Sequence, residues 1–542
     1  MNNNEIKDIA SAEKYRRSLR FLMLALSGIL TGLCLVITKI GFLEWLTLVP
    51  CALFLLMLGS KEGLRYRALY GHGVFFFASF YIVNFHWFVN LYPLDFIDGM
   101  TKGAALCVVI AAWIGLSLFQ AVQGGLVFLL TGIIFRSTVC SRFTFLKPFA
   151  LGAIWAVYEW LQTFGWWGVP WGRLPLGQAE YLVGLQTASW FGPYFVTFMI
   201  VSVNAFIALA LINKEDNSKL KLSCIAAAAL LVFQYGAGTA IWFSHKNTGE
   251  TLKVAVIQGN ISSHEKWDTS SSLKTRQVYE QYTREAAEKG AKIVVWPETA
   301  LPYTIKNGSS YYRFASNIAS ENNVTVLVGA FTVDEDGYYN SLICFTPDGK
   351  TLDNVYSKRR LVPFGEFVPL RSIIETVIPP LADLVMSGDE ITAGEGAQLF
   401  LLDEGAVGSL ICFDSIYEEL TRESVRGGAQ LICLSTNDSW FTDSAALYMH
   451  NAQAQMRAIE SGRYLVRSAN TGISTVINSR GEVIDELAPL VDGIIVEDVC
   501  MRSNTTLYTS IGNLFVYISC LALSLAVAFE IYLYIRKNKK KS

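Results

Sequence analysis

Charge is scarce in this sequence of 542 residues, and the shortage limits the kind of protein that it can encode. Asp, Glu, Lys and Arg make up 17% of the chain and hydrophobic residues make up 52%, whereas soluble proteins carry about 25% charge. This balance argues against a protein that lies wholly in water. The net charge is −2 and the basic residues form short clusters instead of one broad face, so we predict no nucleic-acid partner.

Histidine is also scarce, with five in the chain, and no pair of cysteines has CxxC spacing. Because a zinc site needs Cys and His at short, regular spacing, we predict no metal and no cofactor. The ten cysteines do not suggest a disulfide framework either. Those outside the apolar runs and their short turns lack paired spacing, and they are Cys344, Cys412, Cys433 and Cys500.

Long apolar runs are abundant, and each approaches the roughly 20 residues that a helix needs to cross a bilayer. We predict an α-helical transmembrane bundle of about eight spans, of which the two that contain Glu44 and Glu159 are the least apolar, and Glu159 is a functional candidate. The predicted parts are a membrane domain at 1–251, a polar domain at 252–503 and a last span with a lysine tail at 504–542. The predicted spans lie near 20–38, 42–59, 69–92, 104–133, 148–164, 183–212, 222–243 and 511–535.

Basic residues alternate between the turns, which predicts the orientation of the chain. Lys14, Arg16, Arg17 and Arg20 precede the first span, and every second turn after it is also basic. We therefore expect a multi-pass protein of the bacterial cytoplasmic membrane with both termini in the cytoplasm. The polar domain then lies outside the cytoplasm. The basic turns hold Lys61, Arg65 and Arg67; Arg136, Arg142 and Lys147; and Lys214, Lys219 and Lys221.

From residue 252 onward the pattern changes to short β-rich runs with helical segments between them. The runs read as nearly continuous apolar stretches, which is typical of sheets covered on both faces. We predict an α/β sandwich with two sheets inside and helices outside, in which 272–289 and 447–461 are helices. The clearest predicted strands are 253–258, 292–296, 324–329, 341–345, 407–412, 430–435, 464–468 and 473–478.

Cys412 is a candidate nucleophile because it ends a predicted strand and precedes a helical stretch. A helix N-terminus there would favour the thiolate. A buried cysteine that only fills space is the alternative, and we assign that role to Cys344 and Cys433.

Glu298 and Lys358 are candidates of the same kind. Glu298 follows an apolar strand in the sequence WPE, where a carboxylate suits a general base. Lys358 lies in the sequence YSKRRLVPFGE, where its ammonium suits stabilisation of an oxyanion and Glu366 can hold it in place. Each residue alone also fits a bland role, a capping glutamate or a solvated lysine.

The three motifs together, in this order, resemble the nitrilase superfamily of carbon–nitrogen hydrolases and acyltransferases. The resemblance covers roughly 252–503 and implies an αββα domain. With the surrounding spans, the chain resembles the bacterial apolipoprotein N-acyltransferase family. That resemblance implies transfer of an acyl chain from a membrane phospholipid to the N-terminal diacylglyceryl-cysteine of an apolipoprotein, through a thioester on Cys412.

The resemblance also implies roles for other residues. Glu298 would be the general base, Lys358 would stabilise the oxyanion, and Glu366 would support them. Phe413 and Asp414 stand where the family more often has tyrosine and glutamate. Trp267 matches an aromatic near the substrate entrance.

Two alternatives stay open at this point. If water reaches the thioester, the protein is a membrane-tethered amidase or hydrolase of the nitrilase type. If the polar domain is inactive, the chain is a non-catalytic lipid-binding or transport protein, although no internal repeat of the kind found in transporters is visible.

Overall fold

The computed structural model describes residues 3–60, 65–94, 100–245, 248–262, 272–377 and 390–539. It divides into two compact units. The first consists of Met1–His86, Ile110–Trp242 and Asn513–Ser542, and the second of Trp87–Val109 and Phe243–Gly512. The predicted boundaries at 252 and 503 remain predictions, and each unit is described by itself.

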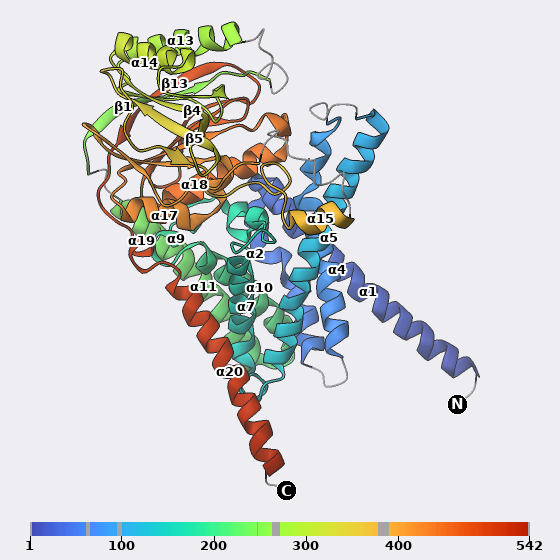
Figure 1. The fold of residues 1–542 in the computed structure, drawn as a ribbon. Coiled ribbons are helices and arrows are strands. Elements are labelled where there is room, and N and C mark those ends of the chain that lie inside the picture. The colour runs from blue at the N-terminus through green and yellow to red at the C-terminus, as the bar shows by residue number, and fades with distance from the viewer. Residues whose placement is uncertain are drawn as a thin grey trace. The chain divides into compact units, whose positions relative to one another are not determined.

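The first unit is helical, as its apolar runs predict (Figure 1). Its long helices are α1 (Asn3–Val36), α4 (Tyr66–Asn84), α5 (Lys102–Phe135), α7 (Lys147–Leu161), α10 (Pro193–Ile212), α11 (Asn217–Ser244) and α20 (Leu514–Lys539), with α5 and α11 extending into the second unit. Short helical segments connect them: η1 (Thr38–Leu43), α2 (Glu44–Thr47), α3 (Val49–Phe54), η2 (Leu55–Gly59), α6 (Thr138–Arg142), η4 (Thr144–Leu146), η5 (Pro170–Gly172), η6 (Leu174–Gln178), α8 (Leu182–Leu185) and α9 (Ala188–Phe191).

Six helical segments in the described part of the chain are long and apolar enough to cross a membrane. They are Arg17–Val36, Thr38–Gly59, Lys102–Phe135, Pro193–Ile212, Asn217–Ser244 and Leu514–Lys539. The predicted spans near 69–92 and 148–164 correspond to α4 and α7, which are helical but lie outside this set. The segment predicted as one span at 183–212 is broken, because Gly192 and Pro193 separate α9 from α10.

The glutamates of the first unit hold the short segment that contains η6. Glu159 Oε1 accepts a hydrogen bond from the Leu174 backbone N–H at 3.0 Å. Glu44 Oε2 accepts from the Gln178 side-chain amide at 2.7 Å. Both glutamates are buried. A buried backbone N–H or amide needs an acceptor, so these carboxylates allow a non-helical segment to lie inside an apolar bundle.

The second unit contains two mixed sheets. Within the described residues, the first has the order β13-β1-β2-β4-β5-β6, with β3 paired to β4, and the second has the order β12-β11-β10-β9-β8-β7. The strands of the first sheet are β1 (Thr251–Gln258), β2 (Ile293–Val295), β3 (Leu301–Thr304), β4 (Thr325–Val333), β5 (Tyr338–Phe345), β6 (Tyr356–Ser357) and β13 (Gly493–Cys500). Those of the second are β7 (Leu399–Leu402), β8 (Gly405–Ile411), β9 (Leu431–Thr436), β10 (Tyr464–Ala469), β11 (Ser474–Ile477) and β12 (Val483–Leu487).

The centre of each sheet is parallel and its margins are antiparallel. In the first sheet β1, β2 and β4 run parallel, and in the second β8, β9 and β10 do. Parallel strands need long crossover connections, usually helices. These are α13 (Ser272–Glu288), α14 (Ser310–Asn322), α17 (Glu418–Arg426) and α18 (Ala445–Ser461); the other helical segments of the unit are η3 (His86–Leu91), α15 (Arg371–Val377), η8 (Cys412–Ile416), η9 (Ser439–Phe441) and α19 (Leu507–Ile511).

The two sheets pack face to face, with helices outside. One core cluster joins apolar residues of both sheets, such as Val256 in β1 and Val466 in β10. A second cluster joins the other face of the first sheet to α13 and α14. In Figure 1 these two helices cover one side of the strands, and α17 and α18, which contact β8 and β10, lie on the other. The predicted αββα sandwich is confirmed.

The alternation of side chains explains why the central strands read as continuous apolar runs. Along β1, Val254 and Val256 belong to the core between the sheets, whereas Ala255 and Ile257 belong to the core under the helices. Successive side chains of a strand point to opposite faces. Since both faces are covered, every position of β1 from Val254 to Gln258 is buried.

Trp296 offers a test of the core between the first sheet and the helices α13 and α14. Its fully buried ring stacks on Tyr279 with centroids 4.7 Å apart, and its Nε1–H donates to Thr283 Oγ1 at 3.1 Å. We expect Trp296→Ala to reduce stability by about 3–5 kcal/mol, and Trp296→Phe by a smaller amount because a ring remains. Thermal unfolding of the detergent-solubilised protein measures this as a lower Tm. An unchanged Tm for the alanine variant would contradict this packing.

Candidate functional site

The predicted site residues lie just beyond the ends of strands. Glu298 follows β2 by three residues, Lys358 directly follows β6, and Cys412 directly follows β8. Carboxyl ends of neighbouring parallel strands lie at the same edge of a sheet, which is where α/β proteins place functional groups. A hydrogen bond from the backbone N–H of Asn437, after β9, to Glu298 Oε2 at 2.8 Å joins the edges of the two sheets.

Lys358 connects the two predicted glutamates. Its Nζ lies 3.1 Å from Glu298 Oε1 and 2.8 Å from Glu366 Oε1. The ammonium is 2% exposed and the Glu298 side chain 6%. Burial alone would lower the pKa of Lys358, but the charges of Glu298 and Glu366 raise it well above its usual value. The lysine is therefore a fixed, buried cation.

Asn340 also belongs to this cluster, although no sequence motif points to it. The residue lies in β5, and its side-chain Nδ2 donates to Glu298 Oε1 at 2.7 Å and to Glu366 Oε1 at 3.3 Å. Its backbone carbonyl accepts from the Lys358 backbone N–H at 2.8 Å. One asparagine thus fixes both glutamates and the lysine. A YYNS stretch inside a strand has no chemical signature, so sequence reasoning could not select it.

The glutamates are also held by backbone donors. Glu366 Oε2 accepts from the Val362 N–H at 2.9 Å, which closes the loop that follows Lys358. Gly329 in β4 lies against the segment that carries Glu298. A Cβ built on Gly329 would lie 2.2 Å from the Pro297 carbonyl oxygen, so this close approach requires glycine.

Cys412 is partly exposed and lies at a strained point of the backbone. Its φ is +48°, a left-handed conformation that few residues other than glycine adopt. Burial of the sulfur and the charge of Glu298 raise the pKa of the Cys412 thiol, whereas Lys358 lowers it. Both charges therefore act on the thiol. Burial is the largest influence on this thiol and favours its protonated form.

Asp414 connects the turn that contains Cys412 with the segment that contains Lys358. Its Oδ2 accepts from the Ile411 N–H at 3.1 Å and from the Tyr356 hydroxyl at 2.8 Å. Its Oδ1 accepts from the Arg360 N–H at 2.8 Å. Burial raises the pKa of Asp414 to about 6, and these donors act in the opposite direction. Phe413, beside it, packs edge-on against Tyr417 with centroids 5.6 Å apart.

The structure therefore brings Glu298, Lys358 and Glu366 into direct contact and places Cys412 in their electrostatic field. Phe413 and Asp414 follow the cysteine, and Asp414 holds its turn. Trp267, the tentative substrate-binding residue, lies outside the described residues.

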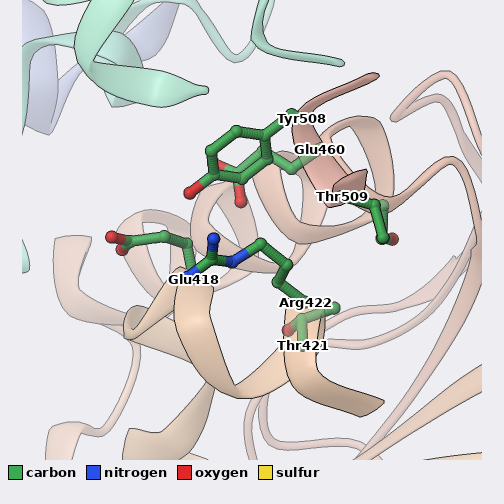
Figure 2. Close-up of a pocket in the computed structure, with 7 residues that line it drawn as sticks. Glu418, Thr421, Arg422, Glu460, Tyr508 and Thr509 are labelled. Atoms are coloured by element: carbon green, nitrogen blue, oxygen red, sulfur yellow. The ribbon is translucent and has the colours of Figure 1, made fainter. Parts of the chain in front are cut away.

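A separate pocket lies between α17, α18 and α19 (Figure 2). Glu460 in it pairs with Arg457 at 2.6 Å, and Figure 2 shows the Arg422 guanidinium below the Tyr508 ring, 5.6 Å from its centroid. None of the predicted site residues lines this pocket, which is formed by Glu418, Thr421, Arg422, Glu460, Ser461, Tyr508 and Thr509.

Comparison with known proteins finds matches to both the N-terminal helical part and the C-terminal α/β part of the chain. Residues 27–206 match the family model of the apolipoprotein N-acyltransferase N-terminal domain, and residues 253–505 match that of the carbon–nitrogen hydrolases. An apolipoprotein N-acyltransferase of Gloeobacter violaceus is 31% identical over 93% of this chain and 93% of its own length. One from Geobacter metallireducens is 31% identical over 69% of this chain and 72% of its own.

The chain belongs to the apolipoprotein N-acyltransferase family. The match over residues 253–505 contains every residue of the cluster described above. In this member of the family, Asp414 bonds to the backbone on both sides of the site.

Asp414 provides a test of how the two segments are held together. We expect Asp414→Asn to lower the Tm by several degrees and to reduce activity, because an amide NH₂ would face a donor in place of an accepting oxygen. The expected loss is about 1–3 kcal/mol. Thermal unfolding and acyl transfer are measured together, with the exposed Asp353→Asn as the control. Equal Tm values for the two variants would show that these hydrogen bonds do not hold the site.

Proposed function

We propose that this protein is an apolipoprotein N-acyltransferase that transfers an acyl chain from a membrane phospholipid to the α-amino group of an N-terminal S-diacylglyceryl-cysteine. Membership of the family supports the activity. The observation that carries the chemistry is the buried Glu298–Lys358 pair acting on the Cys412 thiol. A nucleophile, a carboxylate and a fixed cation are what covalent acyl transfer requires.

Glu298 is the proposed general base. The raised pKa of the Cys412 thiol means that the resting nucleophile is protonated, so a neighbouring base must remove the proton. Oε1 of Glu298 already accepts from Lys358 and Asn340. Its Oε2 accepts from the Asn437 backbone N–H, so both oxygens of the proposed base are held in place.

Lys358 is the proposed oxyanion stabiliser. Because the two carboxylates keep it charged and in place, it needs no reorganisation when negative charge develops on the substrate oxygen. The ammonium has three N–H donors, and Glu298 and Glu366 accept from it. A further N–H can point to the substrate.

The reaction then proceeds in two steps. Glu298 takes the thiol proton, the sulfur attacks the ester carbonyl, and collapse of the tetrahedral intermediate breaks the C–O bond. The lysophospholipid leaves as an alcohol with the proton from Glu298, and a thioester remains on Cys412. In the second step the α-amine attacks the thioester, Glu298 takes the amine proton, and the C–S bond breaks. The proton returns to the Cys412 sulfur, and the lipoprotein carries a new amide.

The membrane arrangement is part of the same proposal. We place eight spans in the bacterial cytoplasmic membrane, with both termini in the cytoplasm and the nitrilase-like domain outside. The basic residues of alternate turns support this orientation. Both substrates carry acyl chains, so they reach the site from the lipid.

Cys412 provides the direct test. We expect Cys412→Ala to fold and to lose all activity, and Cys412→Ser to be nearly as inactive because an alcohol is a weaker nucleophile near neutral pH. After incubation with phospholipid, mass spectrometry should find an acyl adduct on Cys412 in the wild type and in the exposed control Cys224→Ala. Addition of a diacylated lipopeptide should convert the adduct to triacylated product.

Two results would contradict the function. Free fatty acid in place of triacylated lipopeptide would make the protein a hydrolase. Absence of any adduct in the wild type would argue for a non-catalytic lipid-binding protein.

Lys358 provides a second test. We expect Lys358→Met to slow formation of the acyl-enzyme by about 10²–10³-fold, because the oxyanion loses its fixed cation and two buried carboxylates lose their partner. Single-turnover acylation by a fluorescent phospholipid measures this rate. The control is Lys350→Met, an exposed lysine of the same domain. A rate within a few-fold of the wild type would remove Lys358 from the mechanism.

A further inference from the structure

The backbone carbonyl of Cys412 is held by two side chains that the mechanism above does not use. Ser415 Oγ donates to this oxygen at 2.8 Å, and His450 Nε2 lies 3.2 Å from it. The two side chains also contact each other, at 2.9 Å. A non-glycine residue at a φ of +48° persists only where its surroundings fix it, and these contacts lie at that residue.

His450 is itself fixed from its other side. Its Nδ1 lies 3.0 Å from Asp438 Oδ1, and Asp438 Oδ2 accepts a hydrogen bond from Arg467. Arg467 is held in turn by the Ile473 carbonyl, to which its Nε donates at 3.0 Å. All of these side chains are buried, with His450 1% and Arg467 0% exposed. An arginine, a carboxylate and an imidazole thus form one series of side-chain contacts that ends at the nucleophile.

The charged side chains of this series act on the proton of the imidazole. Burial alone would raise the pKa of Asp438, but Arg467 and His450 lower it to about 2. Asp438 is therefore a carboxylate, and its Oδ1 and the Arg467 Nη2 both lie at His450 Nδ1, 3.0 and 3.3 Å away. Nε2 then faces the Cys412 carbonyl and Ser415. Burial and Arg467 lower the pKa of His450, so the imidazole carries one proton. On Nε2 that proton is donated to the Cys412 carbonyl; on Nδ1 it is donated to Asp438, and Nε2 then accepts from the Ser415 hydroxyl of the same turn.

The turn after β9 serves both the nucleophile and the base. The Asp438 side chain fixes His450, and the preceding residue, Asn437, donates its backbone N–H to Glu298 Oε2. Gly472 lies against this turn, since a Cβ there would be 2.4 Å from Asp438 Oδ2. Two neighbouring residues thus determine where the sulfur and its base lie relative to each other.

We infer that His450 is a positioning residue, held by Asp438 and Arg467, that fixes the carbonyl of Cys412 and so directs the sulfur toward the ester carbonyl of the donor lipid. The inference rests on the proposed role of Cys412 as the nucleophile. His450 does not touch the reacting atoms. It acts through the backbone of the residue that does.

Two substitutions at the same position separate positioning from simple structural support. In His450→Gln the side-chain amide reaches the place of Nε2, toward Cys412 and Ser415. In His450→Asn the amide reaches the place of Nδ1, toward Asp438, and the link to the nucleophile is lost. A positioning role therefore predicts that Gln is the better replacement. A role limited to partnering the buried Asp438 predicts that Asn is the better one.

The measurement is the single-turnover rate of acyl-enzyme formation from a fluorescent phospholipid, together with the Tm. We expect His450→Gln to acylate within about fivefold of the wild type. His450→Asn should be slower by about 10- to 100-fold, the scale of a small displacement of a reacting group. Transfer from a preformed thioester to lipopeptide gives the second rate for each variant.

Ser415→Ala tests the same carbonyl from another side chain, and it remains informative if a His450 variant fails to fold. Loss of this hydrogen bond should slow acylation by about three- to tenfold. Because both side chains act on one oxygen, the effects of Ser415→Ala and His450→Asn should not multiply in the double variant. The matched control is Ser424→Ala, a buried serine of α17 whose hydroxyl donates to the Leu420 carbonyl at 3.1 Å. It should acylate like the wild type.

Several results would overturn the inference. These are a faster rate for His450→Asn than for His450→Gln, a wild-type rate for Ser415→Ala, or independent effects in the double variant. Failure of the proposed function is distinct, because the wild type would then form no adduct on Cys412. Wild-type acylation with the wrong ranking of variants refutes only the role of His450.

Discussion

The buried ammonium of Lys358 is the interaction on which the rest of the site depends. Glu298 and Glu366 both accept from its Nζ, and without this cation two buried carboxylates would repel each other. Removing such ions from water costs several kcal/mol for each, so the site needs further donors. The Asn340 amide and the backbone N–H groups of Val362 and Asn437 supply them. The result is a cation that is fixed before any substrate arrives.

These donors come from both halves of the sandwich, so the fold holds the polar cluster together. Asn340 lies in the first sheet and Asn437 follows a strand of the second. Residues of both sheets pack in one core, so the edges that carry Glu298 and Cys412 are held at a fixed separation by well-packed apolar side chains. Asp414 bonds to both the Cys412 turn, after a strand of the second sheet, and the Lys358 segment, after a strand of the first. It thus adds a polar connection between the two sheets. The apolar core thus makes the polar cluster rigid.

The sequence predicted the sandwich and the candidate residues because both leave local patterns. Alternating burial on two covered faces produces the apolar runs of β1 and β9, and Glu298 and Cys412 each follow such a run. Lys358 is marked by the sequence YSKRRLVPFGE around it. Asn340 and His450 leave no comparable pattern, since one lies inside a strand and the other inside a helix. The burial that raises the pKa of the Cys412 thiol also leaves no local pattern, because it is a property of the packed domain.

The sequence by itself determined where the chain is apolar, where runs suited to helices and to strands follow each other, and which residue types end the strands. These features are local, because hydrophobic periodicity and strand ends are set by neighbours along the chain. The tertiary structure decided which carboxylate oxygen meets the ammonium, which asparagine bridges the glutamates, and which imidazole meets the carbonyl of Cys412. Those contacts join residues that are tens of positions apart, so they follow only from the pairing of strands and the packing of helices and sheets.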